Sequence, residues 1–150
     1  EEMFNIGGHS DIVQSCSWNK DGSMIASACR DKKLRVIDPR AQTLAGEVIA
    51  HQGVKGMRCT WLSDKDKILT TGFTKTVERE LCLWDPRSLA EPLTRQSVDN
   101  QSGVLMPFYD PETGMLFLAG KGDGNIRYYE IVDVCYFFIH SNKQHTLHSS

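Results

Sequence analysis

Three short segments with similar sequences recur along the chain, and they constrain its fold more than any other feature. Residues 80–87 read ELCLWDPR, residues 33–40 read KLRVIDPR and residues 125–131 read NIRYYEI, at spacings of 47 and 45 residues. Each string alternates in hydrophobicity over a short run, which is the period of a β-strand and not of a helix. Repetition at about 45 residues is typical of a propeller in which every repeat forms one four-stranded sheet. The sequence therefore predicts an all-β fold made of propeller blades.

Turn signals divide the chain into repeats. We expect residues 1–7 to hold the last strand of a preceding blade (3–6), followed by repeats at 8–49 and 50–99, a partial repeat at 100–132 and a divergent polar tail at 133–150. An antiparallel sandwich is the main structural alternative, since it also uses short strands and frequent turns. The expected strands are 12–18, 24–29, 33–38, 45–49, 57–62, 67–73, 80–85, 104–109, 115–120 and 125–131.

Composition excludes several classes of protein. With 40% hydrophobic and 24% charged residues and a net charge of −2, the chain is expected to be a cytoplasmic globular protein without a basic field for nucleic acid. The apolar runs are too short for a transmembrane helix. The five cysteines lack CxxC spacing, which favours reduced, buried thiols.

The sequence offers little that could carry catalysis or hold a cofactor. Cys135 and three histidines of the tail, His140, His145 and His148, fit no zinc-finger spacing, so we expect no metal. The glycine-rich stretch 120–124 lacks the phosphate-loop pattern and precedes a strand, so no nucleotide cofactor is expected either. A binding platform is therefore favoured over a propeller enzyme, which would need acid, base or metal groups converging on a central pocket.

The pattern of several polar residues along the chain resembles that of the WD-repeat family. In that family a loop His, a strand Ser or Thr, a turn Asp and a strand Trp form a hydrogen-bonded tetrad. The resemblance implies that the first repeat has Ile37 at the Trp position, that Glu78 lies near the Asp position of the second, and that the third has Tyr129 for Trp and no His. The implied tetrad members are His9, Ser27 and Asp31 in the first repeat, His51, Thr71 and Trp84 in the second, and Asp123 in the third.

Longer strings resemble the coronins. They are residues 31–40 (DKKLRVIDPR), 69–73 (LTTGF), 78–85 (ERELCLWD), 103–111 (GVLMPFYDP), 119–123 (AGKGD) and 126–131 (IRYYEI), and residues 51–58 are similar to the two-propeller class. The resemblance implies a non-catalytic, cytoskeletal scaffold that binds and organises actin filaments. It also implies seven blades, so further blades are expected from the intact chain. The alternative is a WD-repeat adaptor in membrane trafficking or ubiquitin-ligase assembly that does not bind actin directly.

No actin contact can be transferred from the family, because its usual filament-binding residues lie in a blade that this chain lacks. The turns between second and third strands nevertheless emerge on one rim of a propeller, and here they are basic. This candidate partner-binding rim, suited to an acidic partner such as actin, consists of Arg30, Lys32, Lys33, Lys75, Arg79 and Lys121.

Overall fold

The computed structural model describes residues 5–133 and 136–138, and these form strands and connecting turns without an α-helix. The strands belong to three antiparallel four-stranded sheets, each following chain order. The first sheet contains β1 (Val13–Trp18), β2 (Ile25–Cys29), β3 (Lys33–Asp38) and β4 (Thr43–Ile49). The second contains β5 (Arg58–Leu62), β6 (Lys67–Phe73), β7 (Arg79–Trp84) and β8 (Thr94–Asp99). The third contains β9 (Leu105–Asp110), β10 (Met115–Gly120), β11 (Ile126–Asp133) and β12 (Tyr136–Phe138).

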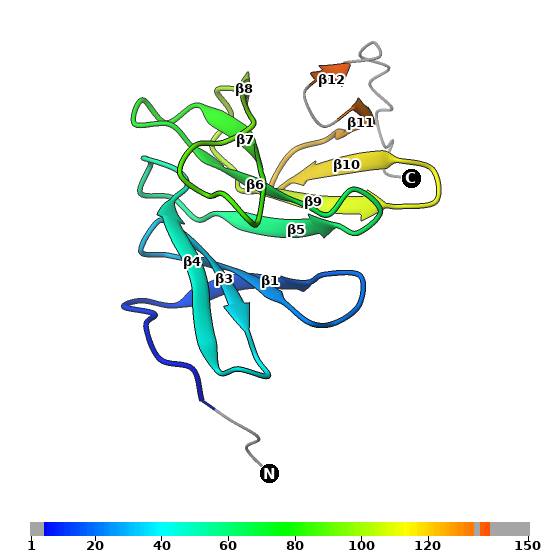
Figure 1. Cartoon of the computed structure of the whole chain (residues 1–150). Coiled ribbons are helices and arrows are strands. Elements are labelled where there is room, and N and C mark those ends of the chain that lie inside the picture. The colour runs from blue at the N-terminus through cyan, green and yellow to red at the C-terminus, as the bar shows by residue number, and fades with distance from the viewer. Residues whose placement is uncertain (1–4, 134–135, 139–150) are drawn as a thin grey trace.

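The sheets stack face to face in chain order (Figure 1). The first strand of each sheet contacts the first strand of the next, β1 against β5 and β5 against β9. This succession of three sheets is the arrangement of neighbouring propeller blades and not of a two-sheet sandwich. The predicted all-β class is confirmed.

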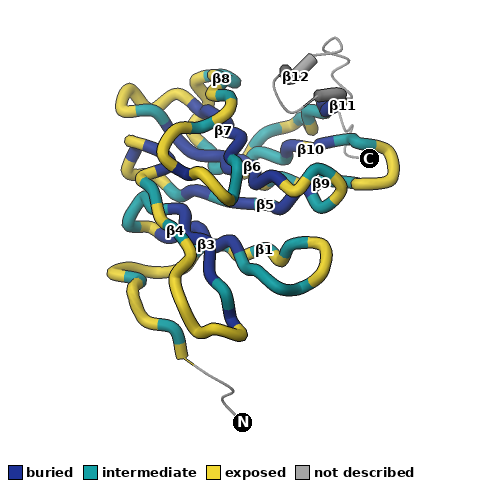
Figure 2. The backbone as a smooth tube through the Cα atoms, in the orientation of Figure 1, coloured by how far each residue is buried: buried dark blue, intermediate teal, exposed yellow. Residues whose placement is uncertain are grey.

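Two apolar cores separate the three sheets. The first joins sheets one and two through residues such as Val36 and Trp84, and the second joins sheets two and three through residues such as Leu83 and Leu116. The middle sheet is therefore covered on both faces, and every residue of β6 and β7 is buried (Figure 2). The polar residues of these two strands are therefore buried as well, namely Lys67, Thr70, Thr71, Arg79 and Glu80.

The contact between β1 and β5 is polar along the strand edges. The side chains of Gln14, Ser15 and Ser17 accept hydrogen bonds from the backbone N–H groups of Met57, Cys59 and Trp61, at 2.9, 2.8 and 2.9 Å. Because β5 is the edge strand of its sheet, these donors would otherwise lack a strand partner. The serines of β1 are thus part of the blade-to-blade junction.

The two outer sheets each leave one apolar face uncovered. On β9, Leu105 is buried against the second sheet whereas Phe108 is 58% exposed, since alternate residues of a strand point to opposite faces. On β1, Trp18 is 52% exposed for the same reason. Other large apolar side chains that are exposed in these sheets are Val13, Leu44, Ile49, Met106, Phe117 and Ile126.

Most expected strands lie where the sequence placed them, and 33–38, 67–73 and 115–120 match β3, β6 and β10 residue for residue. Pro107 lies on β9, an edge strand, where its missing N–H is tolerated. No strand was predicted at the position of β8, because its residues TRQSVD are mostly polar.

Two boundaries differ from the expectation. The repeat expected to end at 132 continues, since β11 reaches Asp133 and β12 pairs with it within the segment predicted as a polar tail. Of the strand expected at 3–6, Asn5 and Ile6 are described and are not in a strand, and the rest lies outside the described residues. Residues 134–135 and 139–150, with the cysteine and histidines of the predicted tail, also lie outside them.

Candidate functional site

The tetrad residues of the first repeat form two pairs instead of one network. Nε2 of His9 lies 2.9 Å from Oγ of Ser27, which is 3% exposed. Asp31 instead binds the guanidinium of Arg35 through both carboxylate oxygens, at 3.2 and 2.6 Å, and accepts a hydrogen bond from Ser10. Burial alone would raise the pKa of Asp31, but the hydrogen bonds from Arg35 and its neighbours hold that pKa well below its usual range.

The second repeat contains a continuous buried chain of hydrogen bonds. Nε1–H of Trp84 donates to Oγ1 of Thr70 at 2.9 Å, Thr70 Oγ1 lies 2.9 Å from Nε2 of His51, and Nδ1 of His51 lies 2.8 Å from a carboxylate oxygen of Glu80. The Glu80 carboxylate can only accept, so His51 donates to it through Nδ1. In the neutral imidazole Nε2 is then an acceptor, and it receives the hydroxyl proton of Thr70, whose oxygen accepts from the indole. Burial lowers the pKa of His51, which favours this neutral form.

Two details of the second repeat correct the sequence interpretation. The hydroxyl in this chain belongs to Thr70, whereas Thr71, its neighbour on β6, points to the opposite face and donates to the carbonyl oxygen of Leu105 at 2.7 Å. The acid is Glu80, inside β7, and not Glu78, which is exposed in the preceding turn. The first correction follows from strand alternation, since a shift of one residue reverses the face. The second arises because Glu78 precedes β7 and is exposed, whereas Glu80 lies within the buried strand.

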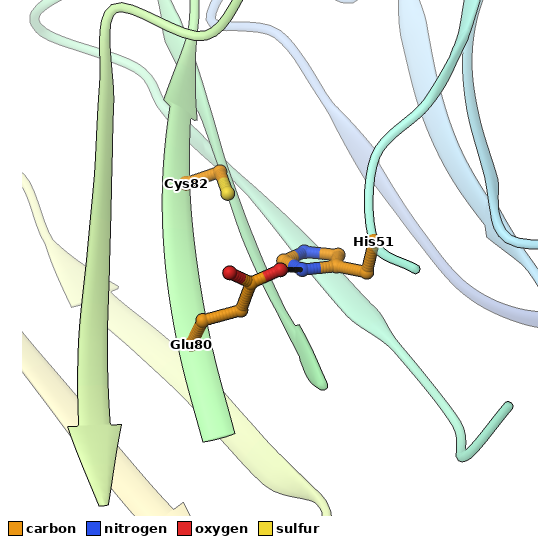
Figure 3. Close-up of side chains that lie close together, drawn as sticks. All are labelled: His51, Glu80 and Cys82. Atoms are coloured by element: carbon orange, nitrogen blue, oxygen red, sulfur yellow. Dashed lines mark hydrogen bonds and ion pairs between the residues drawn. The ribbon is translucent and has the colours of Figure 1, made fainter. Parts of the chain in front are cut away.

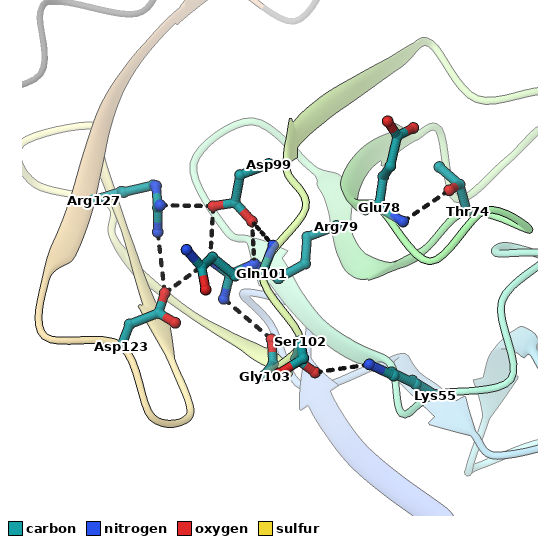
Figure 4. A network of polar contacts seen from close by, with 10 residues as sticks. All are labelled: Lys55, Thr74, Glu78, Arg79, Asp99, Gln101, Ser102, Gly103, Asp123 and Arg127. Carbon is teal, nitrogen blue, oxygen red and sulfur yellow. Dashed lines mark hydrogen bonds and ion pairs between the residues drawn. The ribbon is translucent and has the colours of Figure 1, made fainter.

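In the third repeat, Asp123 belongs to an ion-pair cluster between blades (Figure 4). Arg79 donates to Asp99 at 2.6 and 2.7 Å, to Asp123 at 2.8 Å and to the carbonyl oxygen of Gly103 at 3.1 Å. Arg127 binds the same two carboxylates, Asp99 at 2.6 Å and Asp123 at 3.1 Å. Burial would raise the pKa of Asp99, but Arg79 and its other partners lower it. The cluster fastens β7 to the third sheet.

The predicted rim has to be corrected at one position. Arg79 is fully buried in the cluster just described, so it presents no charge to a partner. Arg30, Lys75 and Lys121 are exposed in their turns. Nζ of Lys32 donates to the carbonyl oxygen of Gln52 at 2.9 Å, and Lys33 pairs with Glu47 at 2.6 Å.

One group of side chains has the composition of a metal site. The ligand atoms of His51, Glu80 and Cys82 lie within 4.8 Å of one another in the buried interior (Figure 3). Both ring nitrogens of His51 are already engaged, and Glu80 also pairs with Arg95 at 2.6 Å. Burial raises the pKa of Cys82 to about 12, so the thiol stays protonated and is a poor ligand. The geometry fits a structural network and not a metal centre.

Comparisons with known proteins agree with the propeller-blade fold. The family model described as "WD domain, G-beta repeat" matches residues 1–38. Coronin-A of Dictyostelium discoideum is 54% identical over 133 residues, which cover 89% of this chain and 29% of that protein. A crystal structure of the WD40 domain from Toxoplasma gondii coronin superimposes with a TM-score of 0.81 and 36% identity, covering 85% of this chain and 33% of that one. The chain thus spans about a third or less of the relatives that it matches.

Proposed function

Because the chain belongs to the coronin family and folds as blades of an incomplete WD-repeat β-propeller, we propose that it is a non-catalytic scaffold that binds and organises actin filaments. The observation that carries this proposal is the 54% identity to a coronin over 89% of the chain. Filament binding places the protein in the cytoplasm, on the cytoskeleton. The described residues include no helix that is long and apolar enough to cross a membrane.

The chemistry of the buried polar groups supports a scaffold. The His9–Ser27 pair is the nearest approach to a hydrolase dyad among the described residues, but Ser27 is 3% exposed and its hydroxyl cannot reach a substrate. His51 has both ring nitrogens occupied within the core. These histidines therefore support the fold, and the surface remains for binding partners.

The rim that we propose for the filament consists of Arg30, Lys32, Lys75 and Lys121. Among the described residues these four side chains pair with no carboxylate. Unpaired surface charge attracts an acidic partner at long range, and salt weakens that attraction. Lys33 contributes less, since Glu47 neutralises it.

Co-sedimentation of the full-length protein with actin filaments tests this proposal. We expect pelleting to weaken between about 50 and about 200 mM salt, and to weaken further in the double variant Arg30→Glu, Lys121→Glu. The double variant Lys20→Glu, Arg40→Glu, at exposed positions in the turns after β1 and β3, is the matched control for charge. Pelleting that is the same in the wild type and the double variant would exclude this rim as the filament surface.

A further inference from the structure

A groove of about 340 Å³ lies where the first two sheets meet. Three connecting segments form it: the turn after β2, the loop between β4 and β5, and the turn after β6. Hydrogen bonds hold these segments together, from Gly53 N–H to the carbonyl oxygen of Phe73 at 2.8 Å and from Ala50 N–H to that of Lys32 at 2.9 Å. The side chains that matter for binding are Lys32, Val54, Lys55, Phe73, Lys75 and Val77.

The walls of the groove are apolar side chains that the described protein does not cover. Val54 is 77% exposed and Val77 is 43% exposed, while Phe73, at 1% exposed, forms the floor. Val77 has a φ of 68°, a conformation that β-branched residues rarely adopt. Strained residues of this kind are concentrated at binding and switch positions. A valine at such a position is better explained by contact with a partner than by the needs of the turn.

The charged side chains that line the groove are all positive. Lys32 and Lys55 donate to backbone carbonyl oxygens, of Gln52 at 2.9 Å and of Ser102 at 3.2 Å, and Lys75 is exposed. Nζ of Lys55 also lies 5.1 Å from the centre of the Phe73 ring. In the part of the chain that the structure describes, none of the three lysines pairs with a carboxylate, and no acidic side chain lines the groove. The groove therefore combines apolar walls with positive charges that no carboxylate among the described residues neutralises.

We propose that this groove binds a short acidic peptide segment of a protein partner, with one large apolar side chain of the peptide seated between Val54 and Val77. Charge complementarity selects the acidic residues and the cleft selects the apolar one. A phosphorylated lipid headgroup fits less well, because its hydroxyl groups would meet valine side chains that cannot form hydrogen bonds with them. The site goes beyond filament binding, although Lys32 and Lys75 belong to both surfaces.

The test uses the full-length protein and a fluorescein-labelled octapeptide in which glutamates flank a central leucine. Fluorescence anisotropy should show saturable, salt-sensitive binding. Val54→Ser and Lys55→Glu should each weaken binding by about tenfold, and both residues are exposed, so folding should be unaffected. Lys20→Glu should bind the peptide like the wild type. Replacing the leucine of the peptide by serine should weaken binding to the wild type but not to Val54→Ser.

The outcomes separate this proposal from filament binding. We expect Val54→Ser to pellet normally with filaments, and the Arg30→Glu, Lys121→Glu variant to bind the peptide normally. Failure of the peptide to bind the wild type would overturn the groove proposal while leaving the filament proposal intact. Equal binding of the leucine and serine peptides would also overturn it, because the apolar cleft would then have no role. Binding of vesicles that contain phosphatidylinositol phosphates, lost in Lys55→Glu while the peptide does not bind, would assign the groove to a membrane instead.

Discussion

The indole N–H of Trp84 donates to the hydroxyl of Thr70 at 2.9 Å, and through Thr70 it is connected to His51 and Glu80. All four residues are at most 4% exposed. The connection joins β7, β6 and the loop that enters the second sheet, so one buried chain of hydrogen bonds fixes three segments. Because each member has a partner, the polar groups are buried without leaving a donor or acceptor unsatisfied.

Removing either end of the Trp84–Thr70 contact should destabilise the protein. We expect Trp84→Ala to lower the free energy of unfolding by about 3–5 kcal/mol, through the cavity in the first core. Thr70→Val keeps the side-chain volume but leaves the indole N–H of Trp84 and Nε2 of His51 without their hydrogen-bond partner, which should cost about 1–3 kcal/mol. Urea unfolding of the full-length protein measures both. Unchanged stability in Thr70→Val would contradict the hydrogen-bond chain.

Gly72 should be irreplaceable for a steric reason that concerns the same network. A β-carbon at Gly72 would overlap with the ring of His51. We expect Gly72→Ala to displace His51 and to cost about 1–3 kcal/mol in urea unfolding, as overpacking does. Gly124→Ala is the matched control, because a β-carbon there meets nothing within 4 Å. Equal stability of the two variants would show that His51 can move aside freely.

The blade architecture could be predicted from the sequence because the third strands repeat at a fixed spacing and turn residues separate the strands. Strands β3, β6 and β10 were predicted residue for residue. Strand β8 was missed because it lies at the outer edge of its sheet, where burial does not impose an apolar pattern. For β12, the apolar run at its position was read as part of a tail.

The candidate site was less predictable because it depends on which face each residue occupies. Thr70 and Thr71 are adjacent and chemically identical, so composition could not choose between them, and pairing of Thr70 with Cys82 was needed to fix the register. Arg79 looks like a rim cation in sequence. Its two carboxylate partners, Asp99 and Asp123, lie 20 and 44 residues away. The sequence next to Arg79 does not indicate such contacts.

Stability should fall as the solution becomes mildly acidic. Burial lowers the pKa of both His51 and His9 from 6.5, so below pH 6.5 the unfolded chain binds more protons than the folded one. The stabilisation is complete above the unfolded pKa and decreases as pH falls below it. Urea unfolding at about pH 7.5 and about pH 5.5 should show the loss, and His51→Gln should reduce the pH dependence. An identical dependence in that variant would mean that His51 does not titrate in this range.

Arg79 and Lys75 should behave oppositely on substitution although they lie close together in sequence. Arg79→Met removes a fully buried cation and leaves two half-buried carboxylates with Arg127 as their remaining cationic partner among the described residues, and we expect a loss of about 3–5 kcal/mol. Lys75→Met removes an exposed charge and should change stability by less than about 0.5 kcal/mol. Thermal and urea unfolding compare the two. If both substitutions changed the stability equally little, Arg79 would have to be assigned to the surface rim again.

The last prediction concerns the uncovered faces of the outer sheets. Trp18 on the first sheet and Phe108 on the third are 52% and 58% exposed on faces that turn away from the middle sheet. Exposed apolar faces of this kind favour association, because a second surface removes them from water. We therefore expect the 150-residue chain alone to self-associate with rising concentration in sedimentation velocity experiments. Changing Phe108 to Glu should reduce association without disturbing either core, since Phe108 belongs to neither. A monomer at every concentration, with a reversible melt, would show that these faces are not adhesive.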